Sequence, residues 1–332
     1  VQGSALTIAV SNAGGLGSLP CAMLSMDNLH SELSAITAAT NKPYNVNFFC
    51  HTPPAPDDAR EAIWRTALAP YYAEYGIDAD LIPTGPGRNP FSHAVADVLE
   101  AFKPPVVSFH FGLPSAELLQ RVRNWGAKIL SSATTVAEAR WLEANGVDAI
   151  IAQGLEAGGH RGIFLARDTN DISTQTGTFA LLPQIVKAVH VPVVAAGGIA
   201  DAKGVAAAML LGAAGVQIGT AYMLCPEATT SALHRAALQS DAATTTALTN
   251  LFTGRPARGI VNRVMQELGS ICTQVPAFPL ATSAIAPLRS AAEKLGRTDF
   301  TPLWSGQNVS GCKPIPAAEL TLELATGLLK RQ

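Results

Sequence analysis

Short apolar runs alternate with amphipathic stretches through the middle of the chain, and this alternation is its most regular feature. The apolar runs are rich in β-branched residues and predict strands, whereas the stretches between them have the periodicity of helices. The predicted strands are 44–50, 106–112, 128–133, 149–154, 192–198 and 215–222. The predicted helices are 115–124, 135–145, 179–189 and 202–211. Such a succession indicates parallel strands joined by crossover helices.

The spacing of these units favours a closed barrel. The strands at 106, 128 and 149 begin 22 and 21 residues apart, and those at 192 and 215 begin 23 residues apart. A TIM (β/α)8 barrel consists of such compact units, one after another. The alternative is a doubly wound open sheet, which places a glycine-rich fingerprint after its first strand, and the sequence has none there. We therefore predict an α/β fold of the TIM-barrel type.

Outside this regular region, the pattern predicts additions to the barrel. The barrel is expected to occupy residues 1–225, with a Pro- and Gly-rich rim insertion of several short helices at about 51–105. From 226 to 332 we expect a mostly helical segment, helical at 227–270, which either caps the barrel mouth or packs outside it. The chain has no initial methionine and opens on a predicted helix at 3–12. Because a barrel should open on a strand, we expect the first strand to be absent from the chain.

Four polar side chains lie near the ends of separate predicted strands. Alternate side chains of a barrel strand face its interior, and active sites form at the carboxyl ends of the strands. Asn47, His110, Gln153 and Gln217 fall on the inward sets of their strands and converge on one rim. Buried amides need hydrogen-bond partners, which a bound heterocycle would supply. The alternative is that these groups satisfy one another and the nearby loops.

Glycines follow the last two predicted strands. Gly197 and Gly198 end one of them, and Gln217, Ile218, Gly219 and Thr220 end the other. In phosphate-binding barrels the loops after strands 7 and 8 hold the phosphate, and glycine lets the backbone approach it closely. We therefore expect a phosphate site here, although tight turns between strand and helix need glycine in any case.

A histidine stands in a third glycine-rich segment, after the strand at 149–154. Gly158 and His160 lie in this segment, which opens an unusually long connection at 155–177. A long loop in a compact domain is commonly functional. An imidazole there can exchange a proton near neutral pH or hold an anionic substrate. The alternative is an ordinary surface histidine.

Composition narrows the possible partners. Hydrophobic residues make up 48% of the chain, charged residues 14%, and the net charge is -2. This balance gives no electrostatic basis for binding nucleic acid or an anionic membrane, so small molecules are the expected partners. The five cysteines form no CxxC pair, and no histidines or cysteines have metal-ligand spacing, so we expect reduced thiols, a cytoplasmic protein and no metal. No apolar run is long enough to span a bilayer.

Four sequence segments together resemble the nitronate monooxygenases, formerly called 2-nitropropane dioxygenases. The segments are QGLEAGGHRG at 153–162, AAGGI at 195–199, QIGT at 217–220 and NVNFFCH at 45–51. The EAGGH and GGI motifs are shared with the FMN-dependent enoyl-ACP reductases, and the NFF segment favours the nitronate-oxidising branch. Residues 304–307 (WSGQ) also resemble a C-terminal segment that returns near the flavin.

The resemblance implies an FMN-binding TIM barrel without a metal. His160 would be its active-site histidine, and His110 would lie in the substrate pocket. The residues expected to contact FMN are Asn47, Gln153, Gly158, Gly197, Gly198, Gln217, Ile218, Gly219 and Thr220. The family's first strand carries an Ala-Pro-Met segment beside the flavin, which this chain lacks.

The implied reaction is the oxidation of alkyl nitronates by O2 to a carbonyl compound and nitrite, without NAD(P)H. His160 would hydrogen-bond the nitronate, or remove the α-proton of a neutral nitroalkane. Three alternatives remain at this point. They are an NAD(P)H-dependent flavin reductase of a quinone or enoyl thioester, a barrel that binds a phosphorylated metabolite without a redox step, and a non-catalytic binding protein. The sequence does not indicate an oligomeric state.

Overall fold

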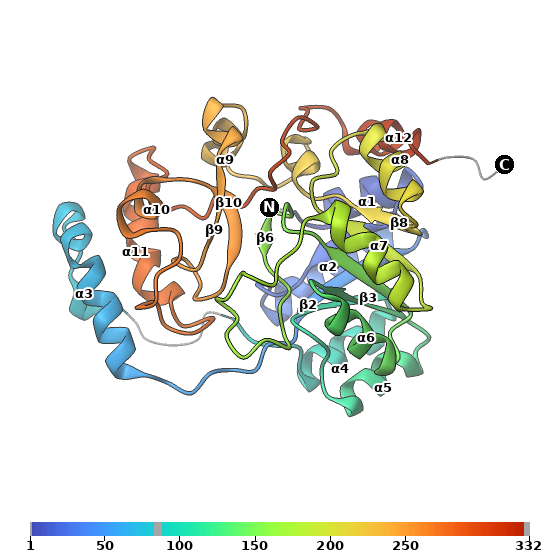
Figure 1. The fold of residues 1–332 in the computed structure, drawn as a ribbon, viewed down its shortest axis with the longest axis horizontal. Helices are drawn as coiled ribbons and strands as arrows, with labels where there is room; N and C mark the ends of the chain where they lie inside the picture. The colour runs from blue at the N-terminus through green and yellow to red at the C-terminus, as the bar shows by residue number, and fades with distance from the viewer. Residues whose placement is uncertain (1, 83–87, 329–332) are drawn as a thin grey trace.

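The centre of the fold is a parallel sheet flanked by helices (Figure 1). The computed structural model describes residues 2–82 and 88–328. Seven strands pair in the order β1-β2-β3-β4-β5-β7-β8 and curl into a half-barrel. They are β1 Gly17–Pro20, β2 Tyr44–Phe49, β3 Val106–His110, β4 Lys128–Ala133, β5 Ala149–Gln153, β7 Val193–Ala196 and β8 Gly215–Gln217. The predicted TIM-barrel-like α/β class is therefore confirmed, with seven strands instead of eight among the described residues.

Helices cover the outer face of this sheet. They are α1 Ser4–Asn12, α2 Met26–Ala39, α4 His93–Phe102, α5 Ala116–Asn124, α6 Val136–Ala144, α7 Thr178–Ala188 and α8 Ala202–Leu210, and α12 Ala317–Ala325 packs against α1 and α8. Side chains that cap the first turn determine where several of these helices begin. The Ser115 hydroxyl accepts from the Leu118 amide, and the Asp201 carboxylate accepts from the Gly204 amide, as N-cap residues do. The strand face beneath the helices is apolar and fully buried, as at Val107 and Phe109.

The sheet leaves a cavity at its open side, between β8 and β1. This cavity has a volume of about 490 Å³. Its walls include Leu130, Ile151 and Val194, whose strands β4, β5 and β7 turn these side chains to the barrel interior, and residues of α1. Mostly apolar side chains line this cavity.

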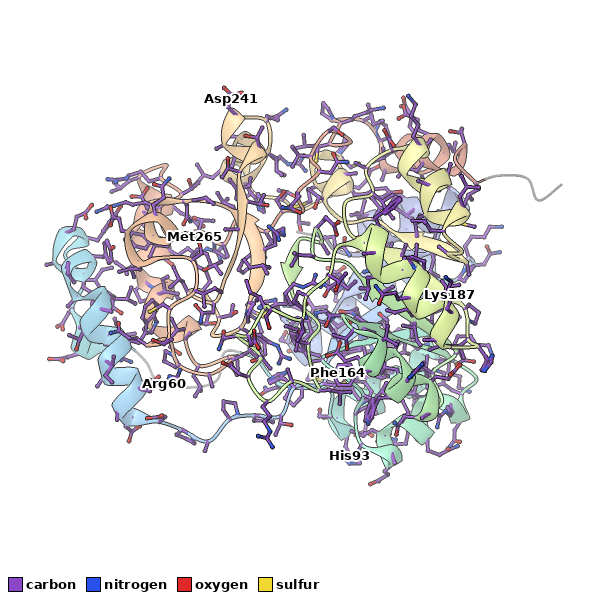
Figure 2. All side chains as sticks on the ribbon, viewed as in Figure 1. Arg60, His93, Phe164, Lys187, Asp241 and Met265 are labelled. Atoms are coloured by element: carbon purple, nitrogen blue, oxygen red, sulfur yellow. The ribbon has the colours of Figure 1, made fainter. Side chains whose placement is uncertain are left out.

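A second lobe stands beside the barrel and draws on distant parts of the chain. Helix α3 (Asp58–Tyr75) leaves the barrel and packs against α11 (Thr282–Lys294), close to α10 (Arg263–Leu268) (Figure 1). Figure 2 places Met265, which is 2% exposed, inside this lobe, whereas Asp241 lies at its tip. The lobe has its own apolar core, in which Trp64 and Phe300 are fully buried. The domain boundary at residue 225 stays a prediction.

A small antiparallel sheet connects the second lobe to the barrel. Its strands lie in the order β6 (Gly159–His160), β10 (Ala257–Ile260) and β9 (Thr246–Thr249). The expectation of helix throughout 227–270 is therefore wrong at β9 and β10. The expected short helices of 51–105 are also corrected, because α3 runs for 18 residues. The remaining short elements are η1 Ala79–Leu81, η2 Thr220–Leu224, α9 Ala232–Leu238 and η3 Asp241–Thr244.

None of the helices in the described ranges combines the length and apolar character that crossing a membrane requires.

Candidate active site

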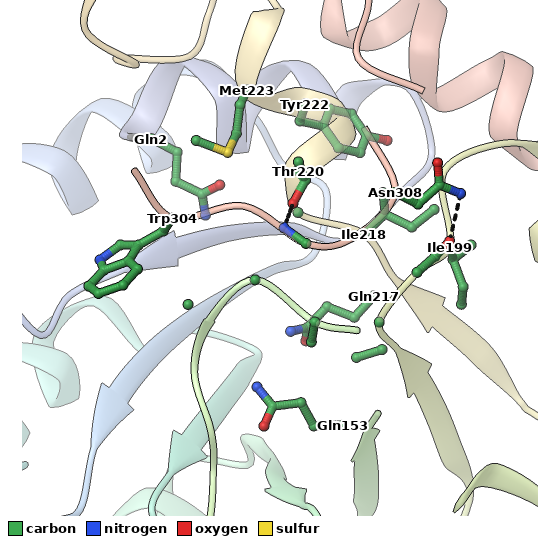
Figure 3. Close-up of a pocket in the computed structure, with 18 of the residues that line it drawn as sticks. Gln2, Gln153, Ile199, Gln217, Ile218, Thr220, Tyr222, Met223, Trp304 and Asn308 are labelled. Carbon is green, nitrogen blue, oxygen red and sulfur yellow. Dashed lines mark hydrogen bonds between the residues drawn. The ribbon is translucent and has the colours of Figure 1, made fainter. Parts of the chain in front are cut away.

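A glycine-lined cavity opens where β7 and β8 end (Figure 3). Its volume is about 280 Å³. The predicted cofactor residues that line it are Gln153, Gly158, Gly197, Gly198, Gln217, Ile218, Gly219 and Thr220. Three elements far apart in the sequence thus bring these residues together. The other predicted site residues, Asn47, His110 and His160, do not line this cavity.

The glycines leave room in this cavity for a ligand. A Cβ at Gly159 or at Gly219 would meet no heavy atom within 4 Å, so it would project into empty space. Gly198 has a φ of 72°, a left-handed conformation that favours glycine. The side chain of Gln217, which also lines the cavity, makes no hydrogen bond to any described residue, so its amide is available to a ligand. These features fit the phosphate and the amide-bearing ring of FMN.

The C-terminal segment closes one side of the cavity. The Gly306 amide donates to the Thr220 hydroxyl at 2.9 Å, and the Asn308 side chain donates to the Gly198 carbonyl at 3.0 Å (Figure 3). Trp304 lines the same cavity. The segment at 304–307 therefore returns to the predicted cofactor loops, as the resemblance implied.

His160 lies just beyond this cavity, inside a group of aromatic rings. The centroid of its imidazole is 5.6 Å from that of Trp304, 5.4 Å from Phe278, 5.9 Å from Phe111 and 5.8 Å from Phe49. His160 belongs to β6 and pairs with Ala257 of β10, so it is held by a strand and not by a loose loop. The rings come from four segments that sequence spacing alone does not bring together.

The hydrogen bonds assign the tautomer of His160. Its Nε2 lies 3.0 Å from the Thr253 hydroxyl, which itself donates to the Arg255 carbonyl at 3.3 Å. The hydroxyl oxygen must therefore accept from Nε2–H, which leaves the lone pair of a neutral ring on Nδ1. Nδ1 makes no hydrogen bond with any residue in the described part of the chain. His160 thus offers an acceptor, not a donor, to a bound molecule.

The loop that carries His160 is fastened by buried side chains. The Gln153 amide donates to the His160 carbonyl at 2.9 Å and accepts from the Gly162 amide at 2.8 Å. The fully buried Arg161 donates to the carbonyls of Gln153 at 2.7 Å and Gly154 at 2.6 Å. The polar groups of Gln153 are thus satisfied within the protein. This was the alternative to ligand binding that the sequence left open for the polar residues at the strand ends.

Asn47 and His110 are also engaged with their neighbours. The Asn47 side chain donates to the Ser108 hydroxyl at 2.9 Å. The Nδ1 of His110 is 2.5 Å from the Ser132 hydroxyl, and its Nε2 is 3.1 Å from the His160 carbonyl. A carbonyl only accepts, so Nε2 carries the proton of His110. The direct contacts of Asn47 with FMN and of His110 with substrate stay predictions.

The histidines near the site are neutral at pH 7. Burial, followed by the nearby Arg255 charge, lowers the pKa of His110 to about 3 and that of His51 to about 4. Burial, followed by the charge of Arg88, lowers the pKa of His160 well below its ordinary value. A neutral imidazole is the form that can accept a proton.

Sequence reasoning missed the two arginines of this region. Arg88 and Arg255 come from separate segments without a recognised motif. The guanidinium carbon of Arg255 lies 3.9 Å from the centroid of the Phe111 ring. Phe111 has a φ of 71°, rare for a residue with a side chain, and no feature of the sequence indicates it.

A glycine-lined cavity after the last two strands is the usual phosphate-binding place of TIM-barrel-like enzymes. The family model for nitronate monooxygenase matches residues 1–327. The chain is 40% identical over 98% of its length to a nitronate monooxygenase of Paraburkholderia phytofirmans, covering 88% of that protein. It is 39% identical over 99% of its length to the nitronate monooxygenase of Pseudomonas aeruginosa, covering 93% of it.

A solved structure agrees with these matches. The nitroalkane oxidase of Streptomyces ansochromogenes superposes with a TM-score of 0.89 and 37% identity, over 99% of this chain and 92% of the other. This chain therefore belongs to the nitronate monooxygenase family, and it is an oxidoreductase.

Proposed function

We propose that this chain binds FMN in the glycine-lined cavity and oxidises alkyl nitronates, and their parent nitroalkanes, with O2. The products are a carbonyl compound and nitrite, and NAD(P)H is not needed. Two nitronate anions and one O2 give two carbonyl groups and two nitrite ions, so atoms and charge balance. The observation that carries the proposal is the neutral His160, with an unpaired ring nitrogen, beside a cavity that fits the cofactor.

The proposed cofactor residues divide into two groups. The backbone at Gly197, Gly198 and 217–220 would hold the phosphate, where the loops after the last two strands leave room for it. Gln153, Gly158 and Asn47 would lie towards the flavin ring. FMN, when bound, supplies the electron acceptor and the reaction with O2.

The role of His160 follows from its tautomer. The lone pair on Nδ1 takes the α-proton of a neutral nitroalkane, while Thr253 holds the opposite ring nitrogen at 3.0 Å. Burial among the aromatic rings, followed by the charge of Arg88, lowers the pKa of His160, so the imidazole is neutral and its Nδ1 is unprotonated when substrate binds. A nitronate has already lost this proton, so its oxidation needs no base.

An anaerobic spectrum tests the proposed reaction. Addition of an alkyl nitronate to the FMN-loaded protein without O2 should bleach the flavin absorbance, and NADH or NADPH should not. Bleaching by NAD(P)H alone would instead indicate a flavin reductase. A folded preparation that binds no FMN would contradict both activities.

A substitution at the imidazole tests its role. His160→Asn should lower kcat/KM for a neutral nitroalkane by about 100-fold or more, the usual contribution of a general base. With a preformed nitronate the loss should stay below about tenfold, because no proton is removed. His190→Asn, at an exposed histidine, is the matched control. Oxygen uptake measures both substrates, and equal losses with both would argue against His160 as a base.

A further inference from the structure

Cationic side chains gather around one phenylalanine beside His160. The Phe278 ring lies 5.6 Å from the guanidinium carbon of Arg88 and 6.0 Å from that of Arg255. Its centroid is 5.4 Å from the imidazole of His160 and 4.8 Å from that of His51. Two arginines and two histidines thus surround a single aromatic ring.

The two arginines have donors without acceptors. Arg255 is 7% exposed, and its Nε has no hydrogen-bond partner among the described residues, although its Nη2 donates to the Ile163 carbonyl. The Nη1 of Arg88 is buried and likewise unpaired, while its Nε donates to the Met23 sulfur at 2.9 Å. A buried donor without an acceptor is costly, so both guanidinium groups are poised for a ligand.

Among the described residues, the one carboxylate whose charge acts on either arginine forms no ion pair with it. Neither arginine takes part in an ion pair with a residue of the described ranges. The carboxylate that acts on Arg255 is Glu138, and both of its oxygens are engaged, with the Phe164 amide at 2.7 Å and the Thr134 amide at 2.7 Å. An unbalanced buried cation attracts an anion.

His160 does not supply the missing donor. Its Nε2–H is used by Thr253, and its other nitrogen only accepts. His110 uses both of its nitrogens on Ser132 and the His160 carbonyl. The free N–H groups in this region are therefore those of the two arginines and the single N–H of neutral His51, whose ring nitrogens have no partner among the described residues.

We propose that Arg88 and Arg255 hold the nitronate anion and make the site select it over the neutral nitroalkane. This inference rests on the proposed function and assigns the two parts of substrate handling to different residues. The arginines recognise the charge that the nitronate already carries, whereas His160 acts only on the form that still has its α-proton. The planar guanidinium suits the two oxygens of a nitronate group.

Arg88→Met in the FMN-loaded enzyme tests the assignment. The KM for a nitronate should rise at least tenfold, while the KM for the matching nitroalkane should change less than twofold. Arg88→Lys keeps the charge and should recover most of the nitronate affinity. Arg140→Met, at an exposed arginine of α6, is the matched control. Equal effects on both substrates would overturn the proposal.

A binding measurement separates this inference from the proposed activity. Nitrate, a planar anion that resembles the nitronate group, is titrated while the flavin absorbance is followed. Its Kd should rise about tenfold in Arg88→Met, with the melting temperature unchanged. If the wild-type protein oxidises no nitronate but the nitrate Kd still rises in Arg88→Met, the anion site is supported and the proposed activity is contradicted. An unchanged nitrate Kd overturns the anion site whatever the activity.

Discussion

At the scale of single residues, glycines matter to the site as much as larger residues do, because they leave space for a ligand. Gly159 and Gly219 leave empty space where a Cβ would point, and both line the cavity assigned to FMN. The four polar residues expected at the strand ends were interpreted as ligands of a heterocycle. In the structure, Asn47, His110 and Gln153 are hydrogen-bonded within the protein, and Gln217 is the one of these four whose side chain makes no hydrogen bond to a described residue.

Filling the space at Gly219 should displace the cofactor. Its φ of -113° lies outside the left-handed region that favours glycine, so Gly219→Val adds volume without the strain of a positive φ. The Kd for FMN, measured by quenching of flavin fluorescence, should rise at least tenfold. Gly215→Val is the control, because a Cβ there also meets nothing within 4 Å, but Gly215 lines only the larger cavity, whereas Gly219 lines both. Equal FMN affinity in both variants would remove Gly219 from the cofactor site.

The arginines of the site could not be predicted from the chain, because their surroundings come from distant segments. Arg88 lies beside Phe278, and Arg255 lies over the Phe111 ring and within 6.0 Å of Phe278. The glycine and histidine motifs were recognisable because each is contiguous in the sequence. The two arginines lack a carboxylate partner in the described part of the chain only because of how the chain folds, so no short stretch of sequence marks them.

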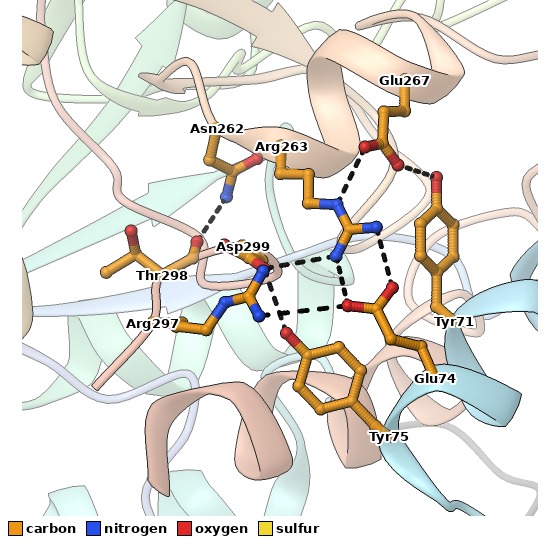
Figure 4. Close-up of polar contacts among 9 residues, drawn as sticks. All are labelled: Tyr71, Glu74, Tyr75, Asn262, Arg263, Glu267, Arg297, Thr298 and Asp299. Atoms are coloured by element: carbon orange, nitrogen blue, oxygen red, sulfur yellow. Dashed lines mark hydrogen bonds and ion pairs between the residues drawn. The ribbon is translucent and has the colours of Figure 1, made fainter. Parts of the chain in front are cut away.

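At the scale of elements, polar contacts fasten α3 to the second lobe (Figure 4). Arg263 bonds to Glu74 at 2.7 Å and to Glu267 at 2.8 Å, and Tyr71 donates to Glu267 at 2.7 Å. Tyr75 donates to Asp299 at 3.0 Å. The contacts join α3 to α10 and to the segment after α11, and the buried side of α3 packs in the same apolar core.

Removal of Arg263 should loosen this attachment. Arg263→Met breaks several pairs at once, so the melting temperature should fall by about 2 °C, since a network counts for more than one exposed pair. Arg289→Met breaks a single pair, with Glu293 at 2.8 Å, and should change the melting temperature less. High salt should reduce the difference between the two variants, measured by circular dichroism.

Element prediction succeeded where hydrophobic runs were long. Strands β2 to β5 and β7 stand out in the sequence because their apolar residues face both the core and the helices. Strand β1 (GSLP) and strands β9 and β10 (TALT, ARGI) are four residues each and mix small or polar residues. The side chain of Arg258 in β10 is buried and donates to the Leu155 carbonyl at 2.9 Å, which no strand pattern predicts.

At the scale of the whole molecule, neutral histidines are buried in both the barrel and the second lobe. His51 and His234 are each 5% exposed, and burial lowers the pKa of each to about 4. The unfolded chain takes up these protons near pH 6.5, whereas the native state resists them until about pH 4. The stability that they contribute is therefore present above pH 6.5 and is lost as the pH falls towards 4.

Acid titration of stability measures this loss. The free energy of unfolding should fall by about 1.4 kcal/mol per pH unit for each such histidine across this interval. His234→Gln keeps a donor for the Trp304 carbonyl, 3.1 Å from the ring Nε2, but cannot titrate, so its slope should be smaller. His93→Gln, at an exposed position, should leave the slope unchanged. Urea unfolding at a series of pH values gives the comparison.

The pairing of β6 with β10 couples the imidazole to the second lobe as well as to the barrel. The carbonyl of His160 accepts from Gln153 and His110 of the barrel, while its backbone also pairs with β10 in the sheet of the second lobe. A small rotation of that lobe against the barrel would therefore move the base relative to the flavin, while the phosphate loops stayed in place. Substitutions deep in the second lobe, far from any substrate atom, can thus alter proton removal without altering cofactor affinity.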